Sequence, residues 1–272
     1  MHLTLAVTRR ELREVVRDFN LLFPMLALPA LIALIAAAAV LGSGRGPANF
    51  IGQAIGGALL EQVPEQQLRP LLYLDVTNLD QAIRVIMKAL LIPLFWVTPV
   101  ALTSTVAADS FVGEKERNTI EPLLATPIRD GQLFAAKLAT AVIPATLGTW
   151  FGIVLFGLLT ARYRGPYFPH FVLADPDWLF SMLVVVPLMA LLAAAVAALI
   201  STRVATYRSA YQLNGLVVLP IILLLVPQTV VLFLFTPYAL LLIAGLFAAL
   251  DAVLVALAMR LFDRERIARG KA

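Results

Sequence analysis

Long uncharged apolar runs alternate with short polar stretches along this chain. A helix needs about 20 apolar residues to cross a hydrocarbon core of about 30 Å, and each run is close to that length. The pattern predicts an all-α integral membrane protein with six transmembrane helices, in a single transmembrane domain over residues 1–272. The predicted spans are 21–41, 89–108, 138–160, 178–200, 213–235 and 238–259.

The distribution of Lys and Arg predicts the orientation of these spans. An even number of spans places both termini on one side of the membrane. Fifteen of the 21 Lys and Arg residues fall on that side, and basic residues gather in cytoplasmic connections. We therefore expect a multi-pass protein of the cytoplasmic (plasma or inner) membrane with both termini in the cytoplasm.

The residues before the first span have the pattern of an amphipathic helix. Leu12, Val15, Val16 and Phe19 repeat at i, i+3, i+4 and i+7, and charged residues occupy the opposite face. This predicts a helix over about 8–20 that lies in the membrane interface against lipid. The alternative is a helical tail surrounded by water.

Composition supports a chain surrounded by lipid. It is 61% hydrophobic and 14% charged, with a mean hydropathy of +0.89, whereas soluble domains have about 25% charged residues. The absence of cysteine excludes disulfides, thiolate metal sites and thiol nucleophiles. The basic residues lie at helix ends and in connections, which fits membrane orientation better than nucleic-acid binding.

The motifs of catalysis are missing. No G-x-x-x-x-G-K-[ST] sequence is present, so the chain has no P-loop for ATP, and H-E-x-x-H and G-x-S-x-G are absent as well. His170, Asp175 and Asp177 could be considered as metal ligands, but Asp175 before Pro176 fits the capped start of the fourth span better. We expect no catalytic residue, no metal and no cofactor bound by this chain.

The cytoplasmic connection 113–131 between the second and third spans changes abruptly from apolar to charged. Glu121 before Pro122 fits a helix N-cap followed by proline at the first helical position, and Pro127 ends that helix about one turn later. The short helix presents Leu123 and Leu124 between charged flanks. The leucines either dock into a partner protein or lie on the membrane surface.

The sequence Gly113-Glu-Lys-Glu-Arg-Asn-Thr-Ile-Glu-Pro-Leu-Leu-Ala-Thr-Pro-Ile resembles the signature of ABC-2 type exporter permeases, particularly their sodium-efflux-like branch. The resemblance implies a transmembrane subunit that forms a homodimer or heterodimer and sits on two ATP-binding-cassette ATPase subunits, which bind ATP and Mg. In this family the loop after the second span is the coupling helix. The positions that match are Glu114, Glu116, Arg117, Thr119, Glu121, Pro122, Leu123, Leu124, Thr126 and Pro127.

The connection 42–88 is the longest in the chain, and we expect short helices on the outer face there. Sodium-efflux-like relatives often carry a much larger insertion at this place. This weakens the transfer of sodium as the substrate, and drugs, peptides, lipids, glycans and sodium all remain alternatives.

Three polar residues inside the predicted spans are candidates for a transport pathway. Asp251 lies near the middle of the sixth run, where a carboxylate costs about 2.5 to 3.5 kcal/mol on insertion scales. It either faces a polar pathway or packs against another helix. Asn214 and Gln228 on the fifth run are weaker candidates, because amides often bridge helices structurally.

Gly148 and Gly152 form a G-x-x-x-G in the third run, a spacing that lets helices approach closely. The close contact lies either within one subunit or between two subunits.

Taken together, the residues and the resemblance predict a non-catalytic permease subunit of an ABC exporter. An ion-coupled secondary transporter that uses Asp251 is the main alternative, and it would transport without ATP. An intramembrane enzyme would need more polar residues at one depth than the chain offers.

Overall fold

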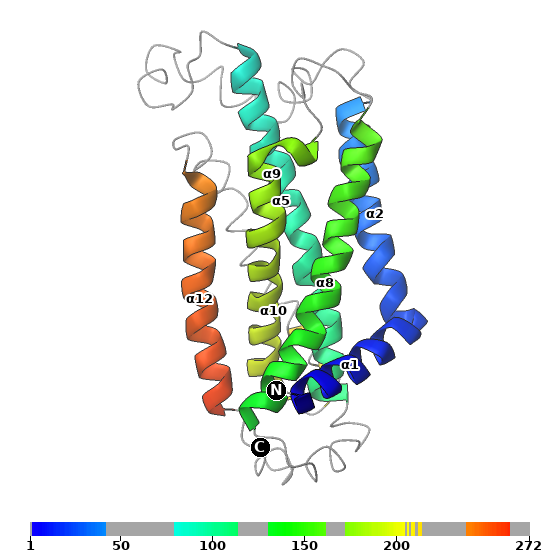
Figure 1. The fold of residues 1–272 in the computed structure, drawn as a ribbon, viewed down its shortest axis with the longest axis vertical. Coiled ribbons are helices and arrows are strands. Elements are labelled where there is room, and N and C mark those ends of the chain that lie inside the picture. Colours follow the sequence, from blue (N-terminus) through cyan, green and yellow to red (C-terminus); the bar gives the residue numbers. More distant parts are fainter. Residues whose placement is uncertain are drawn as a thin grey trace.

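The computed structural model describes residues 2–41, 79–113, 130–161, 172–204, 206, 208–209, 212–213 and 238–261. These residues form a helical bundle without strands (Figure 1). Five helices in this part of the chain are long and apolar enough to cross a membrane: Phe19–Ala38, Lys88–Val112, Gly131–Thr160, Pro176–Ser201 and Ala239–Leu261. The prediction of an all-α integral membrane protein is confirmed, while all of the predicted span 213–235 except its first residue lies outside the described residues.

Helices α2 and α8 run in one direction along the bundle, and α5, α10 and α12 run in the opposite direction (Figure 1). Helix α8 packs on α2, α5 and α10, and α12 packs on α10. Helix α1 lies across one end of the bundle, which we call the α1 end; the opposite end is the far end. The elements are α1 (His2–Arg17), α2 (Phe19–Leu41), α5 (Leu79–Ala108), η2 (Asp109–Gly113), α8 (Asp130–Thr160), η3 (Val172–Ala174), α9 (Pro176–Phe180), η4 (Ser181–Val185), α10 (Val186–Ser201) and α12 (Ala239–Leu261).

Helix α10 ends at the α1 end of the bundle, whereas α12 begins at the far end (Figure 1). The chain has to pass from one end to the other between Ser201 and Ala239, as the prediction of a fifth span in this interval requires. The last described turn of α12 lies at the α1 end (Figure 1).

Two helices are longer than the predicted spans. Helix α5 begins at Leu79, about three turns before the predicted start at 89, and α8 begins at Asp130, about two turns before the predicted start at 138. A hydropathy criterion finds only the apolar part of a helix, and α5 and α8 continue past it. The predicted connection 42–88 is correspondingly shorter, and residues 42–78 lie outside the described part.

The predicted boundary of the interfacial helix, 8–20, is wrong. Helix α1 ends at Arg17, and Asp18 starts the next helix, because its side chain accepts a hydrogen bond from the Asn20 N–H at 2.9 Å. Val15 is buried against the bundle, whereas Val16 and Phe19 are exposed, Phe19 to 71%. Only one edge of the apolar face therefore packs on the bundle.

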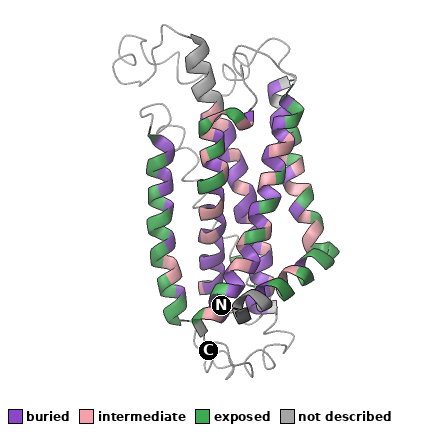
Figure 2. Cartoon of the chain, in the orientation of Figure 1, coloured by how far each residue is buried: buried purple, intermediate pink, exposed green. Residues whose placement is uncertain are grey.

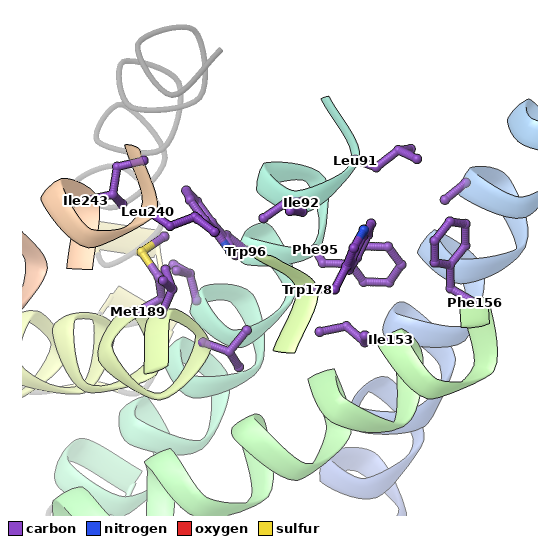
Figure 3. Packing of buried hydrophobic residues seen from close by; sticks show 14 of the residues in the cluster. Leu91, Ile92, Phe95, Trp96, Ile153, Phe156, Trp178, Met189, Leu240 and Ile243 are labelled. Carbon is purple, nitrogen blue, oxygen red and sulfur yellow. The ribbon is translucent and has the colours of Figure 1, made fainter. Parts of the chain in front are cut away.

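Burial follows the inner faces of the helices (Figure 2). At the far end, the rings of Trp178, Phe95 and Phe156 pack against one another in a triangle, with centroids 5.4 to 5.8 Å apart (Figure 3). Helices α2 and α12 expose rows of large apolar side chains on their outer faces. Such faces are stable against lipid tails, which are as apolar as the side chains.

The G-x-x-x-G pair serves packing inside the chain. A Cβ added at Gly148 would lie 2.7 Å from the Met25 carbonyl oxygen, and one at Gly152 would lie 2.7 Å from the Pro29 Cβ. Only glycine lets the backbones of α2 and α8 approach this closely. Of the two alternatives, the structure shows the contact within one subunit.

Candidate functional site

The residues predicted to couple to an ATPase lie in 114–129, outside the described residues. Their roles stay predictions. The structure does show the two stems of this connection, η2 on one side and the start of α8 on the other. The coupling residues concerned are Glu114, Glu116, Arg117, Thr119, Glu121, Pro122, Leu123, Leu124, Thr126 and Pro127.

The first stem ends in a π-helical turn. Helix α5 passes into η2 at Asp109, and the turn ends at Gly113. Ser110, Phe111 and Val112 are all buried there. Turns of this kind are rare and occur often at functional sites, and no sequence pattern indicated this one.

Lys137 of α8 ties the second stem to the first. Its side chain is only 3% exposed. Its Nζ donates a hydrogen bond to the Ser110 carbonyl oxygen at 2.6 Å and lies 5.9 Å from the centre of the Phe111 ring. The Phe111 ring in turn packs on Phe134 of α8, with 6.2 Å between centroids. A buried cation therefore holds η2 and α8 together beside the connection.

A second π-helical turn, η4, interrupts the fourth span near the far end. Two indole groups reach it from neighbouring spans. The Trp96 Nε1 of α5 donates to the Ser181 hydroxyl at 2.8 Å, and the Trp150 Nε1 of α8 donates to the Met182 carbonyl oxygen at 2.7 Å. The third tryptophan, Trp178, buries an Nε1 that has no hydrogen-bond partner among the described residues.

An ion cluster fixes the start of the fourth span. Lys88 Nζ lies 2.7 Å from a carboxylate oxygen of Asp175 and 2.7 Å from one of Asp177. Asp175 also caps α9, accepting a hydrogen bond from the Asp177 N–H at 3.0 Å. The capped start was the favoured interpretation of these residues, and it is confirmed. His170 lies outside the described residues, which contain no group of three residues suited to bind a metal.

Asp251 is buried on the inner face of α12, with 3% of its surface exposed. Neither carboxylate oxygen has a hydrogen-bond partner among the described residues. Asn214 and Gln228, the other predicted pathway residues, lie outside the described part of the chain.

Residues 2–226 match the family model of the ABC-2 type transporter. The chain belongs to the ABC-2 type transporter family. Proteins of this family are membrane transport components, generally non-catalytic, and act with an ATP-binding-cassette ATPase. The match includes both stems, the connection 113–131 and the fourth span, whereas α12 with Asp251 lies beyond it. No curated protein matches the chain.

Membership of the ABC-2 type transporter family confirms the resemblance found in the connection 113–131. It also agrees with a multi-pass location in a membrane. The sodium-efflux-like branch stays a prediction.

Proposed function

We propose that this chain is the permease subunit of an ABC exporter, moving its substrate across the cytoplasmic membrane with ATP hydrolysed by a separate ATPase subunit. The observation that carries the proposal is the family match over 2–226, which includes the predicted coupling segment 113–131. ATP and Mg bind to the partner ATPase. Both termini and the α1 end face the cytoplasm, as the excess of Lys and Arg indicates.

In this proposal the coupling segment docks into a cleft of the ATPase. Leu123 and Leu124 supply the apolar contact, and burying two leucines contributes roughly 3 to 6 kcal/mol. Glu114, Glu116 and Arg117 supply the charged flank of the contact. Closure of the ATPase dimer then pushes on the two stems, η2 and α8.

The complete transporter contains two permease subunits and two ATPase subunits. The permease pair is a homodimer or a heterodimer. The exposed apolar faces of α2 and α12 are available to a second permease or to lipid.

Asp251 is proposed as a position on the polar pathway. A buried carboxylate with no hydrogen-bond partner in the described part of the chain supports this role, because an ionisable residue in a membrane span is by default a functional candidate. The same observation favours the alternative of an ion-coupled transporter.

A pull-down of the tagged chain from its native membranes, followed by an ATPase assay on the eluate, tests the proposal. A stoichiometric P-loop ATPase should co-elute, and the variants Glu121→Ala and Leu124→Asp should lose it while remaining in the membrane. Ala135→Asp, on an exposed position of α8 beyond the coupling segment, is the matched control. A chain that elutes alone, yet transports in liposomes under an ion gradient, would establish the ion-coupled alternative instead.

A further inference from the structure

Helix α8 carries two side-chain donors that each reach the backbone of a π-helical turn. At the α1 end, Lys137 donates to the carbonyl oxygen of Ser110 in η2. Toward the far end, Trp150 donates to the carbonyl oxygen of Met182 in η4. The two turns belong to different spans, and α8 contacts the backbone of both, whereas α5, which continues into η2, reaches only a side chain of η4, the Ser181 hydroxyl, through Trp96.

We propose that α8 transmits motion from the coupling segment to the far half of the fourth span, with Lys137 and Trp150 as its two attachment points. This inference rests on the proposed function, because the motion originates at the ATPase. Neither residue is assigned a contact with substrate. Both are positioning residues: each holds a neighbouring π-helical turn so that the turn moves together with α8.

The π-helical turns suit this role. A π-helical turn holds one residue more than an α-helical turn, so forming or removing it changes which way the following side chains face. Helices bend at such turns. A side chain of another helix that donates a hydrogen bond to one carbonyl oxygen of the turn stabilises the turn. Loss of that hydrogen bond would therefore favour a change in the register and direction of the helix that follows.

Helix α8 has the length to connect the two turns, and it stays helical through Pro144, which lies between Lys137 and Trp150. It is helical from Asp130 to Thr160, and the 13 residues from Lys137 to Trp150 correspond to about 20 Å along its axis. Its first residue lies inside the segment 113–131. A displacement of that segment therefore reaches both stems, η2 at Gly113 and α8 at Asp130, and the Lys137 contact is what makes them move together.

Lys137 fixes the near attachment because its charge is buried. The ammonium group is held by the Ser110 carbonyl oxygen and by the face of Phe111. Moving α8 away from η2 would take a buried cation out of both contacts, which is strongly unfavourable. The two stems should therefore move as one body when the ATPase closes.

The absence of native cysteine allows this to be tested with spin labels on introduced cysteines. One label pair joins Leu158, at the far end of α8, to Leu242 of α12. A second pair joins Leu179 of α9 to the same Leu242. All three positions are exposed. The distances are measured by double electron–electron resonance on the assembled complex in nanodiscs. They are compared between the nucleotide-free complex and the complex trapped with ATP and vanadate. Dilution with unlabelled subunits separates distances within one subunit from those between subunits.

The expected result differs between the two attachment points. In the otherwise unchanged protein, both distances should shift on trapping. Lys137→Met should abolish both shifts while ATPase binding remains, because an apolar side chain of similar volume is tolerated at a buried site. Lys137→Arg, which keeps the charge and the donors, should restore them. Trp150→Phe should keep the shift of the Leu158–Leu242 distance, which reports on α8 and is called the α8 shift. It should abolish only the shift of the Leu179–Leu242 distance, which reports on α9 and is called the α9 shift.

Two control variants each remove a buried polar group that belongs to neither Lys137 nor Trp150. Trp178→Phe removes an indole N–H that has no partner among the described residues. Thr98→Val removes the hydroxyl that lies 3.0 Å from the Thr149 hydroxyl, a buried contact between α5 and α8 that involves neither Lys137 nor Trp150. Both controls should keep both shifts.

Several results would overturn the inference. Unchanged shifts in Lys137→Met, or loss of the α8 shift in Trp150→Phe, would contradict the proposed order, in which motion passes from the coupling segment to α8 and then to the fourth span. Equal losses in the controls show a general packing effect, and a complex without any shift on trapping shows that α8 carries no motion. Failure of the proposed function is distinguishable, since no ATPase would then co-purify with the unmutated chain.

Discussion

Gly152→Ala tests the closest helix contact in the bundle. The added methyl group would lie 2.7 Å from the Pro29 Cβ and 3.0 Å from the Pro29 carbonyl oxygen. Carbon atoms pack best at about 3.5 to 4.0 Å, so α2 and α8 would have to separate by about 1 Å at this point. Part of the opposing contact is backbone, which cannot rotate away.

The expected loss of stability follows from two opposing effects. Overpacking a close contact costs about 1 to 3 kcal/mol, and a clash with backbone belongs at the upper end of that range. Alanine in place of glycine inside a helix stabilises the helix by about 1 kcal/mol. The net loss is about 2 kcal/mol, which corresponds to a fall in Tm of about 4 to 8 °C in a chain of similar size.

Thermal unfolding of the detergent-purified protein, followed by tryptophan fluorescence, measures this change. Gly245→Ala is the matched control, because an added Cβ there meets nothing within 4 Å, and its Tm should be unchanged or slightly higher. A Tm for Gly152→Ala equal to that of the unmutated protein would refute the packing argument. An altered dimer mass at unchanged Tm would assign the glycine pair to a contact between subunits.

Three further predictions concern charge and coupling. Lys88→Met should lower stability by about 1 kcal/mol, since the ion cluster is partly exposed, and the loss should shrink in about 1 M salt; a salt-independent loss in Tm would contradict it. Asp251→Asn should leave Tm unchanged or higher, because the carboxylate has no hydrogen-bond partner in the described residues, and should alter ATP turnover of the complex. A lower Tm with normal turnover would assign Asp251 to packing. Leu124→Asp should weaken ATPase binding at least about tenfold, measured by titration with the purified ATPase; unchanged affinity would remove Leu124 from the contact.

The spans were predictable because membrane crossing leaves a strong local pattern. Five of the six predicted spans correspond to described helices. The starts of α5 and α8 were placed too late, because each helix begins before the charged residue, Lys88 or Lys137, after which the uncharged apolar run starts. The end of α1 was misplaced for a different reason: Asp18 is a local helix cap, and the i, i+3, i+4 pattern continued through it.

The contacts that join the stems could not be predicted from local sequence. Lys137 stands at the start of an apolar run, where lysine usually faces water or headgroups. It is buried because η2, from another part of the chain, covers it. The two π-helical turns have no sequence pattern of their own, and the carbonyl oxygens of Ser110 and Met182 become recognisable as acceptors only once three spans are placed side by side.

The close contact between α2 and α8 also determines where the bundle can change shape. Backbone atoms of Met25 and Pro29 leave no room for a methyl group at Gly148 or Gly152, so these two helices cannot slide past each other without a clash. Helix α12 instead packs on α10 and η4 and exposes most of its leucines. Regions with few buried apolar contacts open at lower free energy than close-packed ones. A displacement delivered to α8 should therefore carry α2 with it and be accommodated between this pair and α12, which makes α12 the suitable reference for both spin-label distances.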